Sequence, residues 1–168
     1  WKFMGDACRV PLAAFRRIGG EALPEPARGL LVHQRDMTST LATFHGGDLR
    51  VDIIQQTQID GIYLREVFLR TVEADRIVEY GVVAIALDQF APAERVEIEA
   101  GRAPLGGLLH RFHIPFESSP INYVAVSTAA LPDALSLVLD QPVCFGRFNL
   151  LTRSTGEALA WILEILPP

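Results

Sequence analysis

The sequence predicts a single α+β domain over residues 1–168, built on a six-stranded antiparallel sheet with helices inserted and packed on one side. Segments of strand length that are rich in β-branched and aromatic residues occupy the middle and the end of the chain. Turn-forming residues separate these segments, and helix-length stretches lie between some of them. With 168 residues, 49% of them hydrophobic, the chain can bury a sizeable core.

The first part of the chain is predicted to contain helices and loops. Residues 11–18 are expected to form a short helix that two glycines end. Asp36 is a predicted N-cap, because apolar residues recur at helical spacing from Met37 until Gly46 and Gly47 end the run.

Six later segments have the length and composition of strands: residues 49–57, 62–72, 77–87, 121–127, 143–152 and 159–166. Asp60 and Gly61 between the first two segments are a strong hairpin signal, and residues 73–75 separate the next two. The first three segments therefore predict an antiparallel meander. Helices are expected at residues 93–100, 104–112 and 132–139, and the last two strands should form a hairpin.

Composition excludes several classes of function. The formal net charge is −5 and no basic stripe is present, so nucleic acid is not an expected partner. No apolar run approaches the ~20 residues that cross a bilayer, and no membrane association is expected. Because the sequence begins at Trp1 and not at Met, it gives no basis for predicting a targeting leader.

Neither a metal nor a cofactor is expected. Cys8 and Cys144 lack any zinc-type spacing and favour two reduced cysteines in a cytoplasmic protein. The four histidines show no metal-ligand spacing, and no phosphate-binding glycine motif is present. The expected partner is a small molecule, and the expected assembly is a monomer or a small homo-oligomer.

Arg65 is a charged residue inside an apolar row. Residues two apart in a strand share a face, which puts Arg65 in line with Tyr63, Val67 and Leu69. Burying a guanidinium without a partner is costly, so Arg65 needs an acidic ligand, an internal ion pair or an edge position from which it reaches water. The residues alone leave these three alternatives open.

Glu164 is the corresponding acidic candidate. It shares its row in the last strand with Ala158 and Ala160, whose small side chains leave room for a cavity. A buried, unpaired carboxyl has a raised pKa and can act as a general acid near neutral pH. A structural pair with an arginine is the alternative, and Arg147 in the preceding strand invites the same two interpretations.

These residues lie in motifs that resemble the chorismate lyase (chorismate pyruvate-lyase) family. The similarity runs from Asp36 to the end of the chain, in the family's order. Its motifs are Asp36-Met37-Thr38, Tyr63-Leu64-Arg65-Glu66-Val67, Pro104-Leu105-Gly106, Gly146-Arg147 and Leu163-Glu164-Ile165-Leu166-Pro167. The resemblance implies a six-stranded antiparallel sheet with a small-ligand cavity closed off from solvent.

The resemblance also implies a reaction and roles for particular residues. The family converts chorismate to 4-hydroxybenzoate and pyruvate without a cofactor. Arg65 would bind the ring carboxylate, Glu164 would face the other end of the ligand, and Met37 and Leu105 would line or cover the cavity. Arg147 and Gly106, from the same motifs, are the further candidates for substrate binding.

The implied chemistry agrees with these residue types. A planar guanidinium can hold a carboxylate through two parallel hydrogen bonds. Aromaticity of the product drives the cleavage, so the protein needs mainly to hold one conformer and to handle one proton. Glu164 could donate that proton to the departing enolpyruvyl group, or it could only bind while the hydrogen moves within the substrate. Both routes stay open.

Two departures from the family pattern leave the substrate open. Gly107 stands where better-known members carry a long basic or polar residue, and Ile121-Asn122-Tyr123 lacks a Thr-Arg pair. The second carboxylate of chorismate would then lack a partner, which keeps open a tailoring reaction on another cyclic or polyketide acid. A non-catalytic domain that binds a small-acid effector, or one that only dimerises, are the remaining alternatives.

Overall fold

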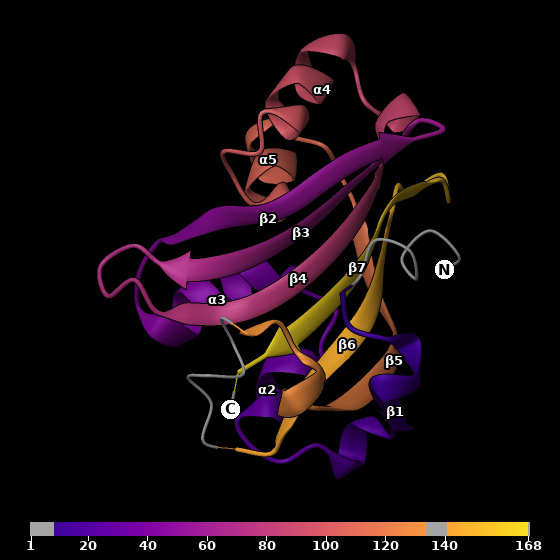
Figure 1. Cartoon of the computed structure of the whole chain (residues 1–168). Coiled ribbons are helices and arrows are strands. Elements are labelled where there is room, and N and C mark those ends of the chain that lie inside the picture. Colours follow the sequence, from indigo (N-terminus) through magenta and orange to yellow (C-terminus); the bar gives the residue numbers. More distant parts are fainter. Residues whose placement is uncertain (1–8, 134–140, 168) are drawn as a thin grey trace.

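The computed structural model describes residues 9–133 and 141–167 and shows an α+β fold around one antiparallel sheet. Its strands are β1 (Phe15–Ile18), β2 (Leu49–Ile59), β3 (Ile62–Thr71), β4 (Ile77–Ala86), β5 (Glu117–Ser127), β6 (Val143–Thr152) and β7 (Ala158–Leu166). Its helices are α2 (Ala27–Leu31), α3 (Met37–His45), α4 (Pro92–Glu99) and α5 (Leu105–Arg111). Short 3₁₀ turns occupy Leu12–Ala14, Gly20–Ala22, Leu87–Gln89 and Thr128–Ala130. The sheet order is β1-β5-β6-β7-β4-β3-β2 (Figure 1).

The sheet has seven strands, so the prediction of six was wrong by one edge strand. Residues 11–18 do not form the predicted helix, because only Leu12–Ala14 turns before the chain extends into β1. β1 pairs antiparallel with β5, and Phe15 packs edge-on against Phe148 of β6. The four residues of β1 are too few to show a strand pattern in the sequence. The hydrogen bonds that hold them extended come from a strand about 110 residues later in the chain.

The predicted meander is confirmed. β2, β3 and β4 pair in succession, and Asp60 and Gly61 join the first two with φ angles of 50° and 79°. Positive φ at both central residues is the backbone of a type I′ hairpin turn, which asparagine, aspartate and glycine favour. The other predicted strands are found as well, although β5 begins at Glu117, four residues before the predicted start.

Three predicted helices are confirmed within one or two residues of their expected ends. Asp36 caps α3 by accepting a hydrogen bond from the Ser39 amide at 2.8 Å, and Gly46 ends the helix with a φ angle of 71°. The helix expected at residues 132–139 falls mostly on residues 134–140, outside the described part of the chain. None of the helices formed by the described residues is long and apolar enough to span a bilayer.

The helices cover one face of the sheet, as predicted (Figure 1). α4 and α5 pack on Tyr63, Val83 and Ile162 in one apolar cluster, and α2 and α3 pack on Leu69 and Leu166 in another. Residues of the opposite face pack against the chain segments around Val10 and Leu131. The polar residues Arg65, Glu79, Arg147 and Glu164 lie on the helix-covered face, between its two apolar clusters.

Candidate functional site

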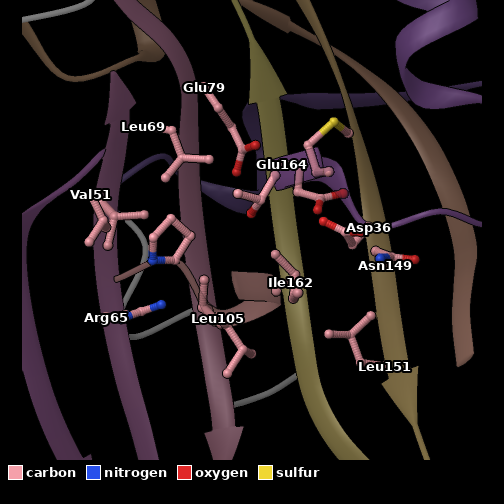
Figure 2. A pocket seen from close by; sticks show the side chains of 16 residues that line it. Asp36, Val51, Arg65, Leu69, Glu79, Leu105, Asn149, Leu151, Ile162 and Glu164 are labelled. Carbon is pink, nitrogen blue, oxygen red and sulfur yellow. The ribbon is translucent and has the colours of Figure 1, made fainter. Parts of the chain in front are cut away.

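A cavity lies between the helix-covered face of the sheet and the N-terminal ends of α3 and α5 (Figure 2). Its apolar wall comprises Met37, Val51, Val67, Leu69, Val83, Pro104, Leu105, Leu151 and Ile162. Its other lining residues are Asp36, Thr38, Arg65, Glu79, Gly106, Asn149 and Glu164. The cavity volume is about 40 Å³, which admits water molecules but is well below the roughly 150 Å³ of a cavity that holds benzene. A ring acid therefore requires the cavity to widen.

Arg65 is buried in this cavity, and none of the described residues is an acidic partner for it. Its side chain has 2% of its surface exposed, and β3 lies between β2 and β4, so it cannot reach water from a sheet edge. Nη1 donates a long hydrogen bond of 3.4 Å to the carbonyl oxygen of Ala103, and Nε has no partner among the described residues. Burial lowers the pKa of Arg65, and the neighbouring Tyr63 only partly opposes that effect. An arginine nevertheless stays charged, so the cavity contains a cation for which the described part of the chain supplies no anion.

Glu164 is paired with Arg147. The two residues face each other across β6 and β7, and Arg147 Nε donates to Glu164 Oε2. Burial raises the pKa of Glu164, while the charge and the hydrogen bond of Arg147 oppose that rise. The Arg147 partnership that the sequence left open is therefore present, and it sits directly beside the cavity.

Arg147 is fully enclosed behind Glu164. Its side chain is 0% exposed, and Nη1 donates to the carbonyl oxygens of Leu31 and His33, each at 3.0 Å. Nη2 donates to the carbonyl oxygen of Arg35 at 3.3 Å. These bonds occupy the guanidinium, and Arg147 is not among the residues that line the cavity. Its place is that of a positioning residue, which holds both Glu164 and the segment that leads into α3.

Glu79 of β4 is a cavity residue that the sequence prediction missed. It is 4% exposed, and its Oε2 atom has no hydrogen-bond partner among the described residues. Burial raises the pKa of Glu79 well above its ordinary value, the negative charge of Glu164 raises it further, and the charge of Arg147 opposes the rise. The signal was present in the sequence, because Glu79 interrupts an apolar strand just as Arg65 does.

The polar groups divide the cavity into two ends. Figure 2 shows Glu79 and Glu164 close together, with Asp36 beside Glu164, whereas Arg65 lies apart from them near Leu105. Apolar side chains such as Val51 and Ile162 fill the intervening wall. A cation at one end, carboxyl groups at the other and an apolar middle suit a small acid whose ring carries a second polar group.

The N-terminal ends of α3 and α5 form the cover of this cavity. Asp36, which caps α3, also lies 3.2 Å from Nε2 of His110 on α5. Gly106 allows this approach, because a Cβ atom at that position would lie 3.0 Å from Asp36 Oδ1. An outer groove between α2 and α3 also has Asp36 in its wall. Widening the cavity would therefore involve the contact between Asp36 and α5.

The structure brings five of the six predicted site residues to one cavity. Arg65, Glu164, Met37, Leu105 and Gly106 all line it. Arg147 lies behind it, as described above. Gly107 and residues 121–123, where the sequence departs from the family pattern, are not part of the lining. Asn149 was also missed as a cavity residue; it is 1% exposed and donates to Ser118 Oγ at 3.0 Å.

The described residues contain no candidate metal site, and their one cysteine is buried. Within residues 9–133 and 141–167, no group of three or more His, Cys, Asp or Glu side chains could hold a metal ion. Cys144 is buried, which raises the pKa of its thiol to about 11, and Cys8 lies outside the described residues. The sequence matches no protein-family model and no curated protein.

Proposed function

We propose that this protein is a chorismate-lyase-type enzyme, which cleaves chorismate to 4-hydroxybenzoate and pyruvate in the cavity without a cofactor. One observation carries the proposal: Arg65 is a buried cation with no acidic partner among residues 9–133 and 141–167, and it lies in the same cavity as Glu164, at the opposite end (Figure 2). A ring carboxylate on Arg65 would direct the para position of the ring toward Glu164. The co-linear motifs from Asp36 to Glu164 support this assignment.

The proposed reaction requires the protein to bind the substrate in one orientation and to allow one proton transfer. Cleavage breaks the bond between the ring carbon and the ether oxygen, and the neighbouring ring carbon loses its hydrogen as the ring becomes aromatic. The departing enolpyruvate gains a proton and becomes pyruvate. Arg65 and the apolar wall would hold the ring in one orientation, which is the larger part of the catalysis. Burial raises the pKa of Glu164 and the contact with Arg147 opposes that rise, so Glu164 could bind the ring hydroxyl or donate the proton.

The test is incubation of the protein with chorismate, with 4-hydroxybenzoate and pyruvate measured as products. In Arg65→Ala, kcat/KM should fall about 30-fold or more, because a buried charge-assisted contact with the substrate is lost. Arg70→Ala is the matched control. Arg70 lies on the same strand but on the opposite face, where its Nε is 2.8 Å from Asp52 Oδ2. A protein that forms neither product, or an Arg65→Ala variant as active as the Arg70→Ala control, would contradict the proposal.

A second candidate is an enzyme acting on another cyclic acid that carries a single carboxylate. The observation that favours it is the charge of the lining, in which Arg65 is the one cation among the described residues. Chorismate has two carboxylates, and its second one would find no unpaired cation there. Binding of 4-hydroxybenzoate without turnover of chorismate would favour this candidate, or a non-catalytic domain that binds a small acid.

A further inference from the structure

Glu79 has no part in the function proposed above, although its carboxyl group lies in the cavity. Its Oε1 atom is 3.1 Å from the point where a Cβ atom at Gly81 would lie, so the side chain leans over the glycine. Gly81 is the register partner of Glu164 across β4 and β7. The missing side chain at Gly81 thus leaves space for Glu79 beside Glu164, and Figure 2 shows the two carboxyl groups close together.

The two carboxyl groups have one counter-charge between them. Arg147 donates to Glu164, and its other hydrogen bonds go to backbone carbonyl oxygens and to the ring of His33, so none of them goes to Glu79. No ion pair joins Glu79 to any described basic residue, and Oε2 of Glu79 has no partner there. Two neighbouring carboxyl groups in a low-dielectric site cannot both ionise, and the one without a cation retains the proton. Burial and the charge of Glu164 both raise the pKa of Glu79, in agreement with this assignment.

We infer that Glu79 contacts the ligand as a neutral carboxylic acid and selects ring acids that carry an uncharged oxygen opposite the carboxylate bound by Arg65, as the ring hydroxyl of chorismate is. This inference rests on the proposed function, because it takes Arg65 as the end that binds the carboxylate. The uncharged oxygen, a hydroxyl or a carbonyl, accepts a hydrogen bond from the Glu79 O–H group. A hydroxyl can also donate to the ionised Glu164.

The same arrangement rejects a carboxylate at the end of the ligand that lies between Glu79 and Glu164. Placed between Glu79 and Glu164, it would meet the charge of Glu164, and the described lining offers no free cation there. A buried, unpaired charge of this kind is strongly unfavourable, whereas a hydroxyl can satisfy both glutamates. The neutral Glu79 and the charged Glu164 together therefore favour an uncharged oxygen at this end of the ligand.

A first experiment tests the proton on Glu79 in the ligand-free protein. The infrared spectrum at neutral pH should contain a protonated carboxyl band that Glu79→Gln removes. Glu66→Gln is the matched control, because Glu66 is equally buried on the same sheet but accepts from Tyr80 and pairs with Arg9. The band should persist in Glu66→Gln. A wild-type spectrum without it, or one that loses it only in the control, overturns the inference whatever the ligand is.

A second experiment compares two probes by calorimetry, 4-hydroxybenzoate and benzene-1,4-dicarboxylate. The wild-type protein should bind 4-hydroxybenzoate at least about 30-fold more tightly, because like charges oppose the dicarboxylate. Glu79→Gln should retain 4-hydroxybenzoate affinity within about threefold, since its amide still donates, and Glu79→Ala should lose about tenfold. Melting temperatures would show that both variants remain folded.

Equal affinity for both probes, with binding abolished by Arg65→Ala, would overturn the role of Glu79 and leave the Arg65 end intact. Unchanged affinity of Glu79→Ala for 4-hydroxybenzoate would likewise overturn the contact between Glu79 and the ligand, and it would leave the binding role of Arg65 intact. If neither probe binds, the ligand class fails together with the proposed function, and the infrared band alone still decides whether Glu79 is protonated.

Discussion

Arg147 and Glu164 lie opposite each other on β6 and β7 and form an ion pair that is almost completely enclosed. The Arg147 guanidinium also donates to the carbonyl oxygens of Leu31, His33 and Arg35. One side chain therefore ties the last two strands to the segment that leads into α3. Because α3 covers the cavity, the same arginine positions the acidic group of the cavity and part of its cover.

Arg147→Ala is expected to lower the free energy of unfolding by about 3–5 kcal/mol, because Glu164 would remain buried without its counter-charge. Adding Glu164→Gln should recover part of this loss, since the neutral side chain needs no cation. Denaturant unfolding of the two single variants and the double variant measures the coupling. Strictly additive losses would show that the two residues stabilise the fold independently.

Arg65→Met is expected to have the opposite effect on stability. Arg65 lacks an acidic partner among the described residues, so an apolar side chain of similar length removes a buried charge without leaving another unpaired. The free energy of unfolding should stay unchanged or rise, by up to about 4 kcal/mol. Binding of 4-hydroxybenzoate should be lost. A loss of stability as large as that of Arg147→Ala would mean that Arg65 belongs to the fold and not to the ligand site.

The raised pKa of Glu79 should make the stability of the folded protein depend on pH. Its pKa in the folded protein is raised above the ordinary value of 4.5, so the folded state retains a proton that the unfolded state releases. The stabilisation by this proton is complete below the ordinary pKa and is lost as the pH rises toward and through the raised one. From about pH 5 upward, wild-type stability should therefore fall relative to Glu79→Gln, by at most about 1.4 kcal/mol per pH unit. Unfolding curves of both proteins at several pH values would reveal it, and parallel profiles would mean that Glu79 ionises normally.

Alanine substitutions at the two adjacent glycines of α5 should have different effects on stability. A Cβ atom at Gly106 would lie 3.0 Å from Asp36 Oδ1, whereas one at Gly107 would meet nothing within 4 Å. Gly107→Ala should stabilise the protein by up to about 1 kcal/mol through helix propensity. Gly106→Ala should gain less or lose stability, because Asp36 must move away from α5. Equal melting temperatures for the two variants would show that α3 yields freely at this contact.

Much of the fold could be predicted because its signals are local. The Asp60–Gly61 turn, the Asp36 cap and the apolar strands depend on residues that are neighbours in the chain. β1 could not be found this way, because its four residues are extended only through pairing with β5. The same limit applies to Arg147, whose carbonyl partners lie more than a hundred residues earlier.

The sequence by itself determined that Arg65 and Glu164 are charged residues in apolar rows, since the two-residue repeat of a strand assigns each side chain to a face. It could not determine which of these charges would be paired. Register places Arg147 opposite Glu164 and brings Glu79 beside Glu164 over Gly81, while none of the residues that the structure describes provides an acid for Arg65. Pairing depends on distances across strands that are far apart in the chain, so only the tertiary structure decided which cation remains free for a ligand and which carboxyl group retains a proton.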